Sequence, residues 1–228
     1  MTLFLVPTPI GNLRDITLRA LDVLKEADGV LCEDTRRTGK FLRHFEIHKP
    51  LVSFHDHSGL GRLAEIVKEL EKGKVMVLVS DSGMPLISDP GFPLVREAIR
   101  RGIKVEALPG PSAVVTALAV SGLPTESFTF FGFLSAKSVA RRKALTELAH
   151  RKETLVFYES PFRLAKALQD MREVFGDREA AVARELTKKF EEIARGRLSD
   201  LIARFSKKKV LGEIVILVAG LGRKEVFL

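Results

Sequence analysis

Three glutamates and three basic residues lie in short polar segments that directly follow predicted strands. A carboxylate can take a proton from a reacting hydroxyl group as a general base, and a nearby cation can stabilise the anion that results. Each of these residues could instead form an ordinary structural ion pair. The six residues that could do this acid–base chemistry are Glu33, Arg36, Glu159, Arg184, Glu185 and Lys188.

One longer segment is rich in glycine, proline and Ser-Asp pairs. It follows the apolar run Val75–Val79, which is typical of a strand buried on both faces. Residues 80–91, SDSGMPLISDPG, can continue neither a strand nor a helix. They predict a sharply turned loop at the carboxyl end of a core strand, where open α/β sheets bind their ligands. An ordinary strand-to-helix connector is the alternative.

The elements that would position these segments alternate between strand and helix along the whole chain. This alternation predicts an α/β fold with mostly parallel or mixed sheets flanked by helices. The predicted strands are Thr2–Val6, Gly29–Cys32, Leu51–Phe54, Val75–Val79, Ile103–Leu108, Phe128–Phe131, Thr154–Tyr158, Ala180–Arg184, Phe190–Ala194 and Glu213–Val218. Helices are expected between them, including Pro93–Arg101, Ala140–Arg151, Phe162–Phe175 and Leu198–Phe205.

The predicted division has an N-terminal α/β domain over residues 1–110, a linker helix and hinge over 111–124, and a C-terminal α/β domain over 125–228. Carboxyl ends of parallel strands share one edge of a sheet, so the polar segments of the first domain should converge there. A cleft between the two domains is the expected ligand site.

Composition and charge narrow the class of protein. The 228 residues suit one large or two modest domains, no signal peptide or spanning apolar run is apparent, and the single cysteine excludes an internal disulfide. We therefore expect a cytoplasmic protein without membrane association. Residues 109–228 hold 21 of the 37 basic residues against 14 acidic ones, which favours a polyanionic partner such as RNA. A solvated lysine-rich surface would give the same count.

Several common site patterns are absent or weak. Residues 59–64 match the loose dinucleotide pattern GxGxxA, but a polar segment separates them from the preceding strand. His55 and His57 could hold a metal ion with Asp56 or Asp34, yet no third ligand stands at a recognisable spacing, and we predict no metal. Neither a GxSxG elbow nor a P-loop pattern occurs.

The polar segments together resemble the tetrapyrrole-methylase superfamily, and within it the small-subunit (16S) ribosomal RNA cytidine 2′-O-methyltransferases. The matching segments span nearly the whole chain and are specific as a set. They are VPTPIGNLRDIT from Val6, EDTRRT from Glu33, SFHDH from Ser53, SDSGMPLISDPG from Ser80, LPGPSA from Leu108, SGLPT from Ser121, FFGFL from Phe130, FYESPFR from Phe157 and ARELTKKFEE from Ala183.

This resemblance implies two α/β domains with S-adenosylmethionine in the cleft between them, usually in a homodimer. It also implies 2′-O-methylation of a cytidine in the decoding region of small-subunit ribosomal RNA, with the RNA or the ribosomal subunit as partner. The residues carried over as cofactor contacts are Ile10, Ser80, Gly83, Met84, Ile87, Ser112, Ala113, Tyr158 and Ala183.

Under this resemblance the six acid–base residues would serve methyl transfer, in which alignment can contribute roughly 7–11 kcal/mol of barrier lowering. RNA is expected over the basic second half, with Arg141, Arg142 and Lys143 on its phosphates. Met84 and Phe162 depart from the family pattern. They leave open a non-catalytic RNA-binding or assembly factor, and methylation of a tetrapyrrole or another small molecule is the other alternative.

Overall fold

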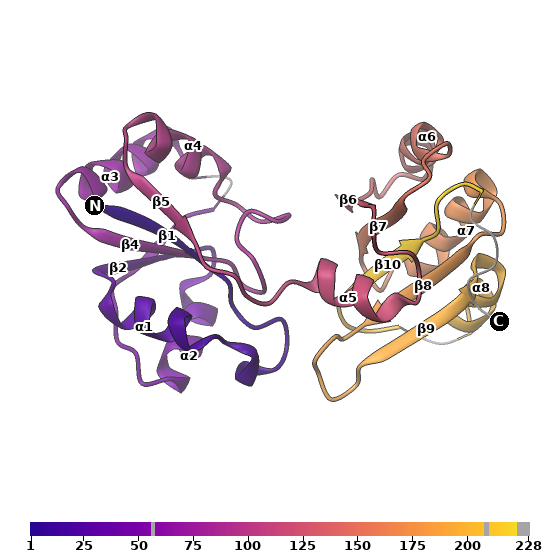
Figure 1. Ribbon diagram of the computed structural model, residues 1–228, viewed down its shortest axis with the longest axis horizontal. Coiled ribbons are helices and arrows are strands. Elements are labelled where there is room, and N and C mark those ends of the chain that lie inside the picture. Colours follow the sequence, from indigo (N-terminus) through magenta and orange to yellow (C-terminus); the bar gives the residue numbers. More distant parts are fainter. Residues whose placement is uncertain (56–57, 208–209, 223–228) are drawn as a thin grey trace. The chain divides into compact units, whose positions relative to one another are not determined.

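The computed structural model describes residues 1–55, 58–207 and 210–222. The chain divides into two compact units between Ser112 and Ala113, which are called the first and second unit below. The α/β fold expected from the sequence is confirmed (Figure 1). The finer division at residues 110 and 124 stays a prediction, and the helix expected as a linker packs on strands of the second unit.

The first unit is built on a five-stranded parallel sheet in the order β3-β2-β4-β1-β5. Its central strand β4 is apolar throughout and almost fully buried, as expected for a parallel strand covered on both faces. The strands are β1 (Thr2–Val6), β2 (Gly29–Cys32), β3 (Leu51–Ser53), β4 (Val75–Val79) and β5 (Lys104–Ala107).

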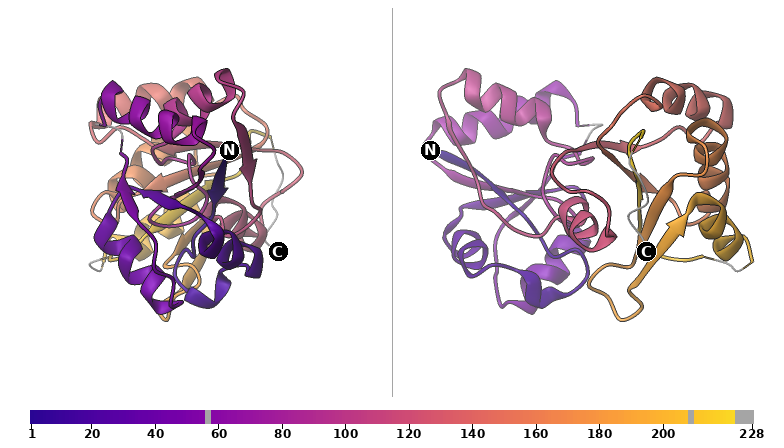
Figure 2. Two further views of the ribbon diagram at one scale, coloured as in Figure 1. Left: turned by 90° about the vertical axis from the view of Figure 1, so that its left-hand side faces the viewer. Right: turned by 45° about the vertical axis from the view of Figure 1, so that its right-hand side comes forward.

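Helices cover both faces of this sheet and form two separate apolar cores (Figure 2). Helices α1 (Leu18–Glu26) and α2 (Thr35–His44) bury Leu24 and Leu42 on one face. Helices α3 (Leu60–Glu71) and α4 (Phe92–Arg100) bury Leu70 and Leu94 on the other. A short 3-10 helix, η1 (Leu13–Asp15), lies in the loop after β1.

The second unit has a mixed five-stranded sheet in the order β6-β7-β10-β8-β9. Strands β6 and β7 are parallel, whereas β10 is antiparallel to β7 and β8, and β9 is antiparallel to β8. The strands are β6 (Phe128–Phe133), β7 (Thr154–Glu159), β8 (Glu179–Arg184), β9 (Glu192–Arg197) and β10 (Ile214–Val218).

Three helices, α6 (Ser138–Leu148), α7 (Leu164–Phe175) and α8 (Leu198–Phe205), enclose the core of the second unit against one face of its sheet. Helix α5 (Ala113–Ser121) contacts β8, β9 and β10 without joining that core. The strand expected from Phe190 begins at Glu192, because residues 185–191 form a turned loop with positive φ at Glu185 and Thr187. Within the described residues, no helix is long and apolar enough to cross a membrane.

Candidate functional site

The loops after β1 and β4 are joined by backbone hydrogen bonds at the carboxyl edge of the first sheet. Thr8 N–H donates to the Gly83 carbonyl and Gly83 N–H donates to the Thr8 carbonyl, each at 2.9 Å. The Thr8 hydroxyl donates to the Ser80 carbonyl at 3.1 Å, and the Ser80 hydroxyl donates to the Gly83 carbonyl at 2.9 Å. Neighbouring parallel strands deliver both loops to one place, so this pairing fixes their backbones against each other.

Gly83 is required by this arrangement. Its φ is 83°, in the left-handed region, and a Cβ there would lie 3.2 Å from Cγ2 of the buried Ile10. Leu86 and Ser88 also have positive φ, at 71° and 64°. Such backbone strain in non-glycine residues costs free energy and clusters at functional sites. The loop therefore has the character of a ligand-binding segment.

The cofactor contacts expected in the first unit fall into a packed group and an accessible group. Ile10, Ser80 and Gly83 are buried and hold the loop together. Met84 is half-buried and Ile87 is 40% exposed, so their side chains are available to a ligand. Ser112 is half-buried and ends the first unit, and Ala113 begins α5 of the second.

An ion pair that was not predicted from the sequence involves the second residue of this loop, Asp81. Arg37 Nη1 donates to Asp81 Oδ2 at 2.7 Å, and Asp81 Oδ1 is buried without a hydrogen-bond partner among the described residues. A buried unpaired carboxylate oxygen is costly unless a ligand or water satisfies it. The position of Asp81 directly after a buried strand was the signal that could have identified it.

The residues after β2 differ in their contacts. Glu33 is exposed and has neither an ion pair nor a hydrogen bond within the described part of the chain. Asp34 caps α2 by accepting from the Arg36 and Arg37 amides. Hydrogen bonds from the Arg36 side chain and these amides hold the pKa of Asp34 below its ordinary value. Cys32, at the end of β2, is fully buried, and burial raises the pKa of its thiol.

In the second unit, two of the expected cofactor contacts share one row of the sheet. Tyr158 on β7 and Ala183 on β8 both pair with Val215 on β10 between them. Residues directly opposite in such a sheet project from the same face. The Tyr158 ring also contacts Phe130 and Phe133 of β6, with centroid distances of 4.8 and 5.5 Å. An aromatic group thus stands in the same row as the small side chain of Ala183.

The next row carries Glu159 and Arg184, which pair with Ile214 and therefore project from the opposite face. Glu159 is 3% exposed, accepts from the Ser160 amide at 2.7 Å and pairs with Arg163 at 2.6 Å. Arg184 pairs with Glu192 at 3.0 Å. Both residues have structural ion-pair partners within their own unit.

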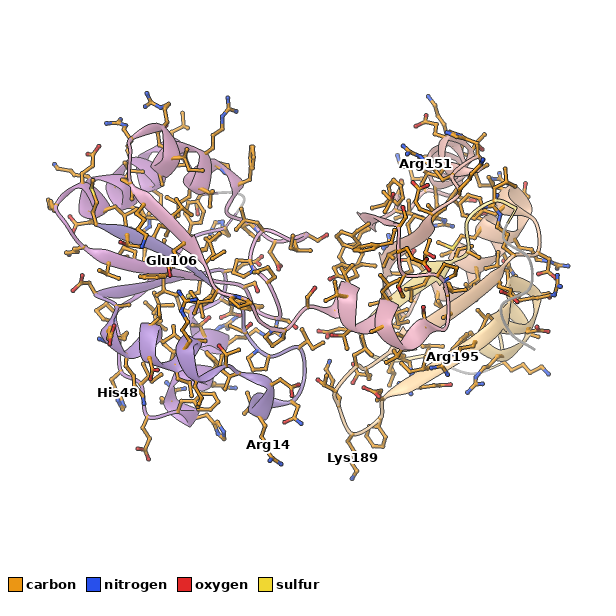
Figure 3. All side chains as sticks on the ribbon, in the orientation of Figure 1. Arg14, His48, Glu106, Arg151, Lys189 and Arg195 are labelled. Carbon is orange, nitrogen blue, oxygen red and sulfur yellow. The ribbon has the colours of Figure 1, made fainter. Side chains whose placement is uncertain are left out.

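Lys188, in the loop after β8, connects Glu185 of the same loop with Glu213, which directly precedes β10 (the neighbouring Lys189 is labelled in Figure 3). Its Nζ donates to Glu185 Oε1 at 2.9 Å and to Glu213 Oε2 at 3.0 Å. Burial acts to raise the pKa of Glu185, but hydrogen bonds from Lys188 and the Glu213 amide outweigh it, and the pKa is lowered. Burial likewise acts to lower the pKa of Lys188, and the two carboxylates reverse this and raise it.

The predicted phosphate-binding role of Arg141 is wrong. Arg141 is 2% exposed and pairs with Asp170 of α7, donating through Nε at 2.7 Å. Its neighbour Arg142 pairs with Glu173 at 2.8 Å, and Lys143 is exposed. The three basic residues therefore have different surroundings, because successive residues of a helix face different directions. Arg141 lies in the core, Arg142 forms a surface ion pair and Lys143 faces solvent.

No group of three metal-ligand side chains lies within residues 1–55, 58–207 and 210–222. Asp56 and His57, which were considered as metal ligands with His55, lie outside the described residues.

A comparison with family models and a comparison with curated proteins both find relatives of this chain. A family model described as Tetrapyrrole (Corrin/Porphyrin) Methylases matches residues 2–202. A protein named ribosomal RNA small subunit methyltransferase I from Thermotoga maritima is 50% identical over 218 residues, which cover 96% of this chain and 98% of the relative. A protein of the same name from Halalkalibacterium halodurans is 49% identical over 98% of this chain and 77% of its own length.

Solved structures share the fold at lower identity. Diphthine synthase aligns with a TM-score of 0.71 and 17% identity, covering 96% of this chain and 90% of its own. Uroporphyrin-III-C-methyltransferase from Thermus thermophilus aligns with a TM-score of 0.66 and 22% identity, covering 95% and 93%.

Proposed function

Because the chain belongs to the tetrapyrrole methylase family, and within it to the ribosomal RNA small subunit methyltransferase I group, we propose that it methylates small-subunit ribosomal RNA. The proposed acceptor is the ribose 2′-hydroxyl of a cytidine in the decoding region. The observation that carries this proposal is identity of about half, over nearly the full length of this chain, with relatives of that name. Methyltransferases of this family use S-adenosylmethionine.

The loop of residues 80–91 fits such a cofactor. Asp81 Oδ1 is a buried acceptor without a partner among the described residues, suited to an ammonium or hydroxyl group. The accessible Met84 and Ile87 offer apolar surface for an adenine ring. We propose that these residues, with Ile10, Ser80, Gly83 and Ser112 in the first unit and Ala113, Tyr158 and Ala183 in the second, hold the cofactor.

The bound cofactor supplies a methyl carbon already activated by its sulfonium. What remains for the protein is to align the ribose hydroxyl, remove its proton and stabilise the oxygen. We propose Lys188 as the cation, because its raised pKa keeps it protonated at neutral pH. Glu185 would orient Lys188, since a lowered pKa makes its carboxylate a weak base.

Glu33 is the carboxylate best suited to act as the base, because it is exposed and has neither an ion pair nor a hydrogen bond within the described residues. Arg36, three residues further along the chain in the first turn of α2, is proposed as a second cation. Glu159 and Arg184 are better suited to positioning roles, since each has an ion-pair partner and projects from the face opposite Tyr158. We further propose that the enzyme acts as a homodimer in the cytoplasm, where ribosomal subunits are found.

The proposal is tested with small ribosomal subunits, and separately naked RNA, from cells that lack the gene. Incubation with purified protein and S-adenosylmethionine should add one methyl group to a cytidine ribose, detected by mass mapping of nuclease fragments. Calorimetry with S-adenosylmethionine runs in parallel. Cofactor binding without RNA methylation would favour a small-molecule acceptor, and the absence of cofactor binding would favour an assembly factor.

A further inference from the structure

We propose that the exposed face of helix α2 binds the phosphate backbone of the RNA substrate. This inference rests on the proposed function, because it assumes that RNA is the acceptor. It differs from the expectation drawn from the sequence, which put the RNA over the second half of the chain. All the residues that carry it belong to the first unit.

The basic residues of α2 lie along one side of the helix. Arg36, Lys40 and Arg43 follow at intervals of four and three residues, and all three are exposed. Arg37 and His44 flank this row and are exposed as well. The buried residues of the helix are Thr38 and Leu42. Arg36 and Arg37 pair with Asp34 and Asp81, but no acidic residue occurs between 35 and 44, and this face keeps a net positive charge.

Helix stability does not account for the basic residues in the first turn of α2. Two arginines in the first turn face the positive end of the helix dipole, which disfavours them. Arg36 and Lys40, four residues apart, repel each other. The Asp34 cap offsets part of this cost at the N-terminus only. The dipole favours Arg43 and His44 in the last turn, so the unfavourable part is the first-turn arginines and the Arg36–Lys40 repulsion, which a bound polyanion would offset.

Intramolecular pairing does not account for it either. At the end of α4, Arg100 and the following residue Arg101 both bond to Glu97 of this helix, as is typical of a solvated basic surface. On α2, Lys40 and Arg43 have no ion-pair partner in the part of the chain that the structure describes. Their charges are therefore available to a ligand.

Two surface hollows adjoin this face of α2. One has a volume of about 660 Å³ and is lined by residues 34–37, Lys40 and Arg43. The other, of about 500 Å³, shares Arg37 and Lys40 with the first and reaches Ser80 and Asp81 of the ligand-binding loop. From Arg36 to Arg43 the helix rises about 10 Å, room for more than a single phosphate. A chain of phosphates along α2 would lead directly to the loop proposed to hold the cofactor.

The test compares two charge reversals of equal size on opposite faces of the first sheet. The test variant is Lys40→Glu with Arg43→Glu on α2. The matched control is Lys68→Glu with Arg96→Glu on α3 and α4, which are exposed and unpaired within the described residues. Binding of a fluorescein-labelled single-stranded RNA oligonucleotide of the decoding region is measured by anisotropy at several salt concentrations. Thermal unfolding verifies that each variant is folded.

The test variant should bind RNA at least about tenfold more weakly, and the magnitude of its slope of log K against log salt should fall by about 1.4, as expected for two lost phosphate contacts on a single strand. The control should change neither quantity to that extent. The neutral variant Lys40→Gln with Arg43→Gln should show a smaller loss in the same direction, which covers the case in which the reversal does not fold.

Each of the other outcomes contradicts either the α2 inference or the proposed function. If the wild type binds and methylates RNA while the test and neutral variants keep its affinity and slope, the α2 inference is wrong and the proposed function stands. An equal loss in the test variant and the control also overturns it, because a nonspecific field would then explain binding. If the wild type neither binds nor methylates RNA, the proposed function fails and the inference fails with it.

Discussion

Lys188 and Glu185 show how one contact can serve both stability and chemistry. The lowered pKa of Glu185 means that its ionised form favours the folded state. This contribution is present above the ordinary pKa of 4.5 and is lost as the pH falls through the lower pKa of the folded protein. The raised pKa of Lys188 is the opposite case, with a contribution present below 10.5 and lost as the pH rises through the folded value.

For Glu185→Gln we therefore expect a loss of unfolding free energy that is constant near neutral pH and shrinks at acidic pH. Urea unfolding at a series of pH values measures it. Glu147→Gln, at an exposed residue of α6 without an ion pair in the described chain, is the control and should show no such trend. Methylation at the full rate by Glu185→Gln would remove Glu185 from the proposed machinery.

Gly83 allows a second prediction at this scale. Gly83→Ala should weaken S-adenosylmethionine binding, because the φ of 83° costs about 1–2 kcal/mol for an alanine and the methyl group presses on Ile10. Gly73→Ala is matched, since Gly73 has a φ of 98° but its Cβ would meet nothing within 4 Å. Calorimetry should find weaker cofactor binding for Gly83→Ala alone. Equal affinities in the two variants would show that the loop does not depend on Gly83.

At the scale of elements, α6 is attached to α7 by a buried ion pair, and this can be tested directly. Removing one partner of a buried pair costs about 3–5 kcal/mol, because the other charge is left in the core. Asp170→Ala should therefore destabilise the protein by that amount in urea unfolding, since Arg141 is 2% exposed. Glu173→Ala, which removes the partner of the more exposed Arg142, should cost about 0–1 kcal/mol. Similar losses for both would mean that Arg141 is solvated.

The elements themselves were largely predictable, and the reasons are local. The run Val75–Val79 is an apolar strand in sequence and in structure, and the glycines and prolines after it end the strand where expected. The burial of Arg141 was not predictable, because its partner Asp170 lies 29 residues away on another helix. The late start of β9 at Glu192 depends on positive φ angles at Glu185 and Thr187, which side-chain types alone do not indicate.

At the scale of the whole molecule, the net charge along the sequence and the surface proposed to bind RNA point to different units. The second half of the chain holds most of the basic excess, yet Arg142, Arg163, Arg184, Lys188 and Arg204 there all pair with acidic residues. The first half is nearly balanced in charge, yet among its described residues Lys40 and Arg43 of α2 have no ion-pair partner. Counting charges along a sequence cannot distinguish these cases, because pairing depends on which elements the fold brings together.

The burial of Cys32 has a practical consequence. The chain's single thiol lies inside the first sheet, and its raised pKa keeps it protonated and unreactive at neutral pH. Maleimide dyes would therefore react with cysteines introduced at the exposed Lys68 and Lys143 and leave the native residue unmodified. Resonance energy transfer between two such dyes, one on each unit, would then measure whether the distance between them changes as the methyl donor is added, without any mutation of the natural cysteine.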